Sequence, residues 1–257
     1  MEKKRFKLTI AYDGTNYCGW QIQPNGITVE EVINKKLSKL LKEDITVIGA
    51  SRTDSGVHAL GNVAVFDSVT TIPGDRIAAA LNQRLPDDIV ITKSEEVSPD
   101  FHPRYCDCSK TYEYHIINTR TPIPTKRLTN YFVSYGLNIE DMKKAASYLV
   151  GEHDFVSFCN VRTNVENTVR TITDLTVTKT GDEITIRITG NGFLYNMVRI
   201  IVGTLIRVGR GFYTPEKVKE ILEAKDRKAA GVTAPPHGLM LVEINYQEEN
   251  KKNDKIC

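Results

Sequence analysis

The feature that most restricts the fold of this chain is an order of strand and helix patterns that occurs twice. Apolar residues alternate with polar ones where a half-buried strand is expected, and they recur every three or four residues where a helix would pack on one face. In the first half the order is strand, helix, strand, strand, helix, strand. The segments that carry it are residues 5–12, 29–41, 45–49, 62–66, 74–85 and 89–97.

The second half repeats this order of elements without repeating the residues themselves. A long strand pattern is followed by a helix that is capped at Asn138 and stopped at Gly151, and then by a hairpin with a Gly-Asp turn. A strongly apolar helix, a short helix that begins at Thr214 and Pro215, and a closing strand follow. The segments are residues 105–118, 138–151, 169–189, 193–208, a helix from 214 onward, and 239–246.

Two successive split βαβ units of the ferredoxin-like kind explain this order most simply. The predicted fold class is therefore α+β, with two ferredoxin-like (βαββαβ) halves whose mainly antiparallel sheets meet around a central cleft. We expect residues 1–103 to form the N-terminal half, residues 104–247 the C-terminal half, and residues 248–257 a polar, disordered tail. A cleft between two halves is where a binding site is most expected.

Composition excludes some classes of protein but does not select a function. The net charge is only +2, so a nucleic acid would have to meet basic groups that are gathered on one face. The N-terminus lacks the apolar run and the cleavage site of a signal peptide, and no stretch approaches the roughly 20 apolar residues of a membrane helix. We expect a cytoplasmic protein that does not bind a membrane.

Two possible cofactor motifs are set aside. The five cysteines include no C-x-x-C pair, and the histidine, aspartate and two cysteines of residues 102–108 have no second ligand pair to complete a metal site. The glycines of residues 190–192 resemble the start of a dinucleotide fingerprint, but Tyr195 occupies the third glycine position. We therefore expect neither a metal nor a nucleotide cofactor.

The densest polar segment is the loop GASRTDSGVHA at residues 49–59, between two apolar strands. A structural turn needs one or two polar residues, whereas this loop holds Arg52, Thr53, Asp54 and His58. In an extended chain, Arg52 and Asp54 would point the same way. The loop is either a reactive loop or a well hydrogen-bonded turn.

Arg199 interrupts the most apolar part, residues 192–203, of the helix predicted in the second half. Apolar side chains cover nearly every face of residues 192–203, which is typical of a buried helix. If Arg199 is buried there, its guanidinium needs an ionised partner, and Asp54 is an attractive candidate. Such a pair would lower the pKa of Asp54 and keep it deprotonated. The alternative is that Arg199 extends to the surface.

Two tyrosines, Tyr112 and Tyr114, share one face of the long strand in the second half. Paired aromatic residues of this kind are usually part of the core. The functional alternative is that one of them stacks on a substrate or carries a proton beside the carboxylate. A free phenol titrates near pH 10, so it would act as a base only with assistance.

Six ordered segments that span nearly the whole chain resemble the TruA-type tRNA pseudouridine synthases. They are YDGTNYCGWQIQP at 12–24, GASRTDSGVHA at 49–59, FHPRY and KTYEYHI at 101–116, GEHDFVSF at 151–158, GNGFLYNMVRIIVGTLIRVGRG at 190–211 and GVTAPPHGLMLVEINY at 231–246. The resemblance implies the pseudouridine synthase fold. It also implies that Asp54 is the catalytic aspartate, that Arg199 is its paired arginine, and that Tyr112 is the active-site tyrosine near the target uracil.

Further roles concern contacts with RNA. Arg52 matches the arginine that takes the place of the flipped base, and Leu239 matches the apolar residue that packs against that base. We expect Thr53 and His58 of the same loop to contact the substrate as well. Basic residues that could follow the phosphate backbone, or could equally be solvated surface charges, are Arg104, Lys110, Arg162, Arg170, Arg207 and Arg210.

The implied activity is the isomerisation of uridine to pseudouridine in the anticodon stem-loop of tRNA, at positions 38 to 40. The family is homodimeric, uses an aspartate on a flipped-out base, and needs no metal or cofactor. The carboxylate can add to C6 of the uracil or act at the ribose, and the sequence leaves both open. The alternative function is a non-catalytic RNA-binding protein with RNP-like sheets, although no RNP1 pattern of adjacent aromatics is found.

Overall fold

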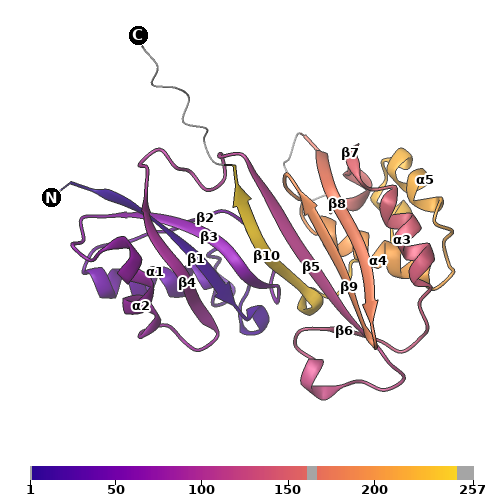
Figure 1. Cartoon of the computed structure of the whole chain (residues 1–257), viewed down its shortest axis with the longest axis horizontal. Coiled ribbons are helices and arrows are strands. Elements are labelled where there is room, and N and C mark those ends of the chain that lie inside the picture. The colour runs from indigo at the N-terminus through magenta and orange to yellow at the C-terminus, as the bar shows by residue number, and fades with distance from the viewer. Residues whose placement is uncertain (1, 161–166, 248–257) are drawn as a thin grey trace, which may run out of the picture.

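The computed structural model describes residues 2–160 and 167–247, and their strands form one continuous, mostly antiparallel sheet (Figure 1). The strand order is β4-β1-β3-β10-β5-β9-β8-β7, with β2 paired to β3 and β6 paired to β5. The polar tail from residue 248 and the basic candidate Arg162 lie outside the described residues. Among those that are described, no helix has the length and apolar character needed to cross a bilayer.

The first half follows the predicted order of elements. Its elements are β1 Lys4–Tyr12, α1 Val29–Leu41, β2 Ile48–Gly49, β3 His58–Ser68, α2 Ile77–Asn82 and β4 Ile89–Val97. Strand β1 lies between β3 and β4 and pairs antiparallel with both. Thr28 caps α1, because its side chain accepts a hydrogen bond from the backbone N–H of Glu31.

The second half contains the same core elements as the first half and three more. Helix α5 was predicted from the sequence, whereas β6 and β7 were not. The elements of the second half are β5 Cys108–Asn118, β6 Tyr131–Val133, α3 Ile139–Ser147, β7 Gly151–Asp154, β8 Val169–Thr180, β9 Glu183–Gly190, α4 Met197–Gly209, α5 Lys217–Ala224 and β10 Leu239–Tyr246. The predicted hairpin of β8 and β9 and the closing strand β10 are confirmed.

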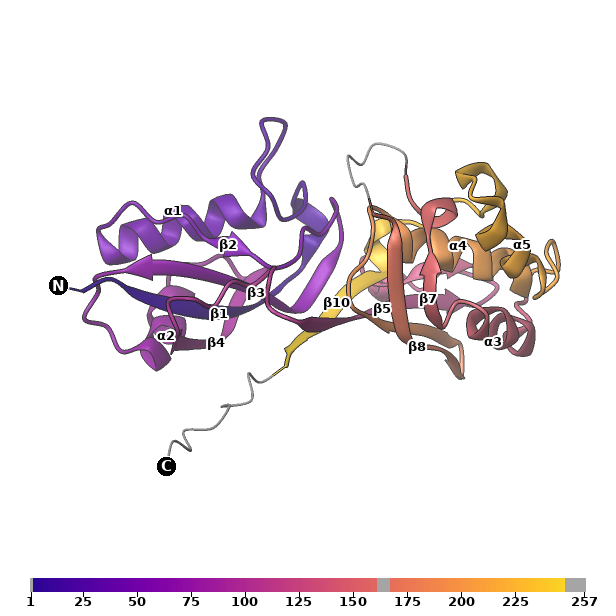
Figure 2. The same ribbon diagram turned by 90° about the horizontal axis from the view of Figure 1, so that it is seen from above.

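The two halves have equivalent strand orders, which confirms the predicted α+β fold of two ferredoxin-like units. In each half the last strand lies beside the first, the first beside the third, and the third beside the second: β4-β1-β3-β2 and β10-β5-β9-β8. The two sheets join where β10 pairs in parallel with the start of β3, at Met240 opposite His58. Figure 2 shows the halves on either side of this junction.

Several elements begin or end differently from the prediction. The apolar helix α4 begins at Met197 rather than near residue 193, because Asn196 adopts a left-handed backbone conformation with φ of 60°. A 3-10 turn precedes α2, so the helix there is shorter than expected. The helix expected at Thr214 and Pro215 begins at Lys217, and β2 contains two residues instead of five.

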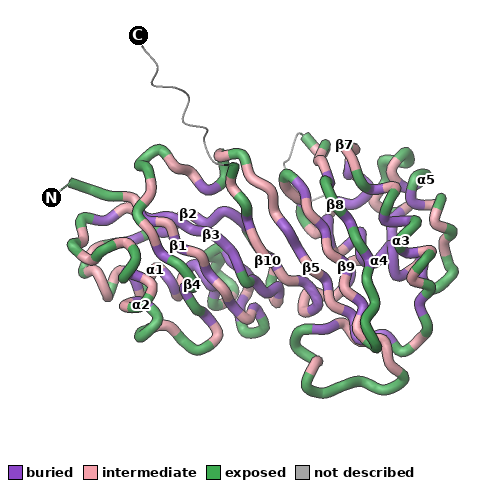
Figure 3. Tube along the Cα trace, in the orientation of Figure 1, coloured by how far each residue is buried: buried purple, intermediate pink, exposed green. Residues whose placement is uncertain are grey.

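The hydrophobic core is one cluster that runs through both halves. Figure 3 shows buried chain along the central strands and in α4, whereas the outer loops are exposed. Eleven of the thirteen residues of α4 are buried, and the two exceptions are Arg199 and Arg207. Helix α4 is therefore almost entirely internal, as its sequence predicted, and any charge near its start lies close to the core.

A close backbone approach fixes α4 against the segment before β10. A Cβ atom added to Gly203 would lie 1.8 Å from the carbonyl oxygen of Val232. The clash should outweigh the better helix propensity of alanine, so we expect Gly203→Ala to lower the free energy of unfolding by about 1–3 kcal/mol. Urea denaturation measures this change.

The matched control is Gly136→Ala, because nothing lies within 4 Å of a Cβ added there. This control should leave the unfolding midpoint nearly unchanged. Equal midpoints for Gly203→Ala and the wild type would contradict the close approach of the two segments.

Candidate active site

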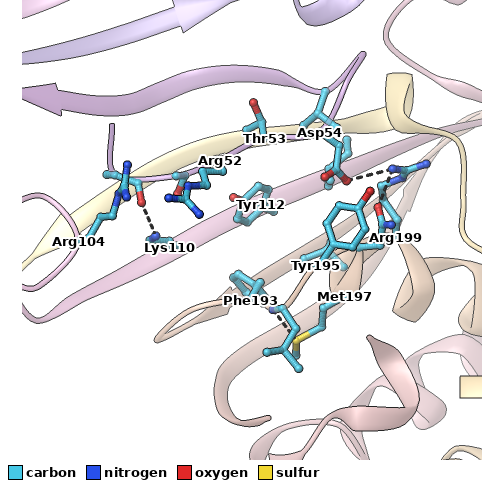
Figure 4. A pocket seen from close by; sticks show the side chains of 17 residues that line it. Arg52, Thr53, Asp54, Arg104, Lys110, Tyr112, Phe193, Tyr195, Met197 and Arg199 are labelled. Atoms are coloured by element: carbon cyan, nitrogen blue, oxygen red, sulfur yellow. Dashed lines mark hydrogen bonds and ion pairs between the residues drawn. The ribbon is translucent and has the colours of Figure 1, made fainter. Parts of the chain in front are cut away.

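A cavity of about 620 Å³ opens between the two halves, beside the junction of β3 and β10. Its floor includes Lys110 and Tyr112 from β5 and Leu239 from β10. One wall is the loop of residues 50–57, and the other is the segment 193–199 at the start of α4. The predicted central cleft is therefore present, and polar groups from both halves line it (Figure 4).

An ion pair joins the two walls of the cavity. The Nη1 atom of Arg199 donates to Oδ2 of Asp54 over 3.0 Å, and the two side chains are 15% and 21% exposed. Arg199 also donates from Nη1 to Oδ1 of Asn196 and from Nε to the carbonyl oxygen of Ala234. The predicted contact between Arg199 and Asp54 is thus present, and the arginine does not extend to the surface.

The N-terminal segment fixes the loop that carries Asp54. The backbone N–H of Trp20 donates to the carbonyl oxygen of Thr53, and that of Gly56 donates to Tyr17. The hydroxyl groups of Tyr12 and Thr53 lie 2.8 Å apart in a buried hydrogen bond. These contacts to the loop were not predicted from the sequence. The aromatic residues Tyr12, Tyr17 and Trp20 were the feature of the sequence that could have indicated them.

Burial sets the direction of the pKa shift of Asp54, and the direction predicted from the sequence was wrong. Burial raises the pKa of Asp54 above its ordinary value, while the hydrogen bond and the charge of Arg199 lower it in part. The sequence argument considered only the opposite charge and left out the loss of hydration around a largely enclosed carboxylate. The ion pair therefore limits an upward shift instead of producing a downward one.

Tyr112 lies between the carboxylate and the basic end of the cavity (Figure 4). Burial raises the pKa of its phenol to about 12, and the nearby charge of Asp54 adds to the shift. Its ring packs edge-on against Phe193, with the ring centroids 5.3 Å apart. Tyr112 is therefore a neutral phenol at pH 7, held by an aromatic neighbour, and is not a ready base.

Three cations gather at the end of the cavity away from Asp54 (Figure 4). Arg104 donates from Nε to the carbonyl oxygen of Gly49, and Lys110 donates from Nζ to that of Ala50. Burial lowers the pKa of Lys110, and the charge of Arg104 lowers it further. Arg52, exposed at the rim, likewise contributes to a lowered pKa of Arg104. This end of the cavity is suited to an anionic ligand.

His58 is not brought into the cavity, and Thr53 lines the cavity wall with its hydroxyl already engaged. The ring of His58 is buried, where Nδ1 accepts a hydrogen bond from the backbone N–H of Gly14 and Nε2 lies 2.8 Å from the carbonyl oxygen of Leu128. The Thr53 hydroxyl is engaged by Tyr12, although Thr53 lines the wall. We attribute this to the packing of the loop, which turns both side chains inward.

The more distant basic candidates also lie away from the carboxylate. Arg207 and Arg210 line a separate hollow of about 300 Å³, where Arg210 stacks over the ring of Tyr135. Arg170 donates to the backbone carbonyls of Asn167 and Val169 and does not line the cavity.

Among the cavity residues that were not predicted as site residues are Phe193, Tyr195, Asn196 and Met197. The sequence placed the first three inside a regular helix, but the left-handed Asn196 turns residues 193–196 out of the helix and into the wall. Asparagine adopts this conformation more readily than most residues, which was the available signal.

The cysteine and histidine cluster near residue 106 does not form a metal site in the structure. Among residues 2–160 and 167–247, no group of three or more histidine, cysteine, aspartate or glutamate side chains is placed to hold a metal ion.

Comparison with known proteins is consistent with these residues. The family profile described as tRNA pseudouridine synthase matches residues 8–106 and 145–247. The chain belongs to the tRNA pseudouridine synthase family.

Curated relatives are similar over nearly their whole length. A tRNA pseudouridine synthase A of Thermoanaerobacter sp. (strain X514) is 52% identical, with 93% of this chain and 98% of that protein covered. The tRNA pseudouridine synthase A of Bacillus subtilis (strain 168) is 48% identical, with coverage of 94% and 99%. A protein of Clostridium perfringens named tRNA pseudouridine synthase A 2 is also 48% identical, with coverage of 95% and 100%. Both matched segments of the family profile contribute walls of the cavity.

The opposing effects on Asp54 give a testable prediction. Arg199→Met removes the hydrogen bond and the charge that limit the upward shift, so we expect the pKa of Asp54 to rise further. Carbon-13 NMR titration of the Asp54 carboxyl group should show its midpoint at a higher pH in the variant than in the wild type.

Arg187→Met is the matched control, because Arg187 forms ion pairs with Glu113 and Glu243 and does not line the cavity. It should leave the Asp54 midpoint in place. An unchanged midpoint in a folded Arg199→Met variant would contradict the proposed balance of burial and charge.

Proposed function

We propose that this protein isomerises uridine to pseudouridine in tRNA, at uridines 38 to 40 of the anticodon stem-loop, with Asp54 as the reacting carboxylate. The observation that carries the proposal is the ion pair of Asp54 and Arg199 in the wall of a cavity with a basic far end. This arrangement can receive a nucleobase at one end and the attached phosphates at the other. Membership of the tRNA pseudouridine synthase family supports the choice of reaction and of substrate.

The target uracil would have to leave its stack to reach Asp54, at a cost of roughly a few kcal/mol. Tyr112 and Leu239, which lie on the cavity floor, would hold the extruded base between them. Arg52 is exposed at the rim and would fill the space that the base leaves in the RNA. Thr53 and His58 would act indirectly, since their side chains hold the loop and its surroundings instead of meeting the base.

The proposed reaction rearranges bonds within one nucleotide. The N1–C1′ bond breaks, the uracil turns, and a C5–C1′ bond forms; C5 then loses its proton and N1 gains one. Asp54 would assist as an anion, either by adding to C6 of the uracil or by adding to C1′ of the ribose, and it is released unchanged. The product has the same atoms and the same oxidation state as the substrate, so the reaction needs no oxidant, reductant or activated phosphate.

Proton transfer from C5 cannot rest on Tyr112 alone. Its pKa of about 12 keeps the phenol protonated near neutral pH. We therefore assign Tyr112 to contact with the base, and we assign acceptance of the C5 proton to water or to the Asp54 carboxylate as it is released. This replaces the role of proton acceptor that the sequence suggested for Tyr112.

The basic end of the cavity would bind the RNA backbone. Arg104 and Lys110 line this end beside Arg52, and their positive charges would attract phosphate groups. Each side chain also donates a hydrogen bond to a backbone carbonyl, of Gly49 and Ala50 respectively. We retain Arg170, Arg207 and Arg210 only as candidates for more distant phosphates.

Three further features belong to the proposal. We propose that the protein acts as a homodimer in the cytoplasm, because a second copy would extend the basic surface that a chain of net charge +2 can offer. We also propose that residues 1–103 and 104–247 are the two structural units of the protein. The rival function is RNA binding without catalysis.

The substitution Asp54→Asn separates the two functions. In the enzyme it removes the anion but preserves side-chain size, so we expect turnover to fall at least about a thousandfold while RNA affinity stays within a fewfold of the wild type. Turnover is measured as tritium release from tRNA labelled with [5-³H]uridine, and affinity by filter binding.

Asp87→Asn is the matched control, since Asp87 is exposed and does not line the cavity. It should release tritium at the rate of the wild type. Binding of tRNA without any tritium release by the wild-type protein would favour the rival function.

A further inference from the structure

A second hollow lies directly beside the active-site cavity. It has a volume of about 450 Å³ and is lined on one side by residues of the segment 18–25. The two hollows share four residues, Arg52, Thr53, Asp54 and Tyr195. Because they have these walls in common, one continuous strand of RNA can occupy both.

The segment that lines this second hollow is held rigidly at its base. The backbone N–H of Cys18 donates to the carbonyl oxygen of Ile27, and that of Ile22 donates to a carboxylate oxygen of Glu30. The side-chain amide of Gln23 donates to the carbonyl oxygen of Cys18. Figure 2 shows the loop before α1 standing out from the body of the protein. The loop is therefore a fixed projection, and it is attached through Trp20 to the loop of Asp54.

The groups that face this hollow are suited to a nucleobase. Tyr195 is 48% exposed and Ile22 is 50% exposed, so an aromatic ring and an apolar side chain are open to a ligand. The amides of Gln21 and Asn25 are exposed and make no hydrogen bond to any residue that the structure describes. Unstacked RNA bases are typically held by an aromatic ring and by polar groups that bond to the base edge.

We propose that this second hollow binds the nucleotide next to the target uridine, with its base against Tyr195 and its edge facing Gln21 and Asn25. The inference rests on the proposed function and adds a second base-binding subsite to it. The loop then holds the neighbour of the uridine, while the ion pair acts on the uridine itself. The loop amides touch neither Asp54 nor the cavity that holds the target base.

The test combines a protein variant with a change in the RNA. The double variant Gln21→Ala and Asn25→Ala is compared with the wild type on tRNA that is intact, that lacks the base 5′ to the target, or that lacks the base 3′ to it. We expect the variant to lose about tenfold in kcat/KM on intact tRNA. On one of the two abasic RNAs the wild type should lose a similar factor, and the variant should lose nothing more, because both changes remove the same contact.

The matched control is Gln83→Ala, which removes an exposed amide just after α2, far from both hollows. It should behave as the wild type on all three RNAs. The subsite would be overturned if the loss in kcat/KM from the double variant and the loss from the missing base multiplied on both abasic RNAs. It would also be overturned if the double variant were as active as the wild type on intact tRNA. Either result would leave the proposed function intact. A wild-type protein without activity on intact tRNA would instead refute the function on which the subsite depends.

Discussion

The ion pair of Asp54 and Arg199 is the contact on which the rest of the site depends. It joins residues 145 positions apart and comes from opposite halves of the protein. The pairing of β10 with β3 sets the distance between the halves, and the carbonyl oxygen of Ala234 directs the guanidinium toward the carboxylate. Burying an ion pair removes both charges from water, and this desolvation offsets the attraction between them. The ion pair therefore serves to position Asp54 and to keep a positive charge beside it, and it adds little to the stability of the fold.

The same cavity combines a carboxylate with an excess of positive charge. Arg52, Arg104 and Lys110 place positive charge at one end, while burial raises the pKa of Asp54 at the other. Arg199 resolves this conflict locally, because it is the one cation that contacts Asp54 in the described part of the chain. In the proposed reaction, the cleft would therefore hold RNA phosphates at its basic end and keep Asp54 available as an anion at the other.

The sequence predicted what depends on local pattern and on simple charge balance. Alternation and helical spacing gave the element order of the first half and that of the second half without β6 and β7, and an arginine within an apolar segment gave the partner of Asp54. The sequence did not reveal that Asn196 turns residues 193–196 into the cavity wall, or that Tyr12 and Trp20 secure the loop of Asp54. These features, and the inward-facing His58, arise from tertiary contacts between distant segments. The raised pKa of Asp54 likewise needed the extent of burial, which no pattern provides.

The central claim is that the paired carboxylate meets the extruded base. The most direct measurement is a crystal structure of the protein bound to an anticodon stem-loop in which 5-fluorouridine replaces the target uridine, since fluorine at C5 cannot leave as a proton does. We predict the fluorinated base between Tyr112 and Leu239, in contact with Asp54, while Arg199 still donates to that carboxylate. A base bound outside this cavity, or an Asp54 that has left Arg199 and points away from the base, would contradict the account.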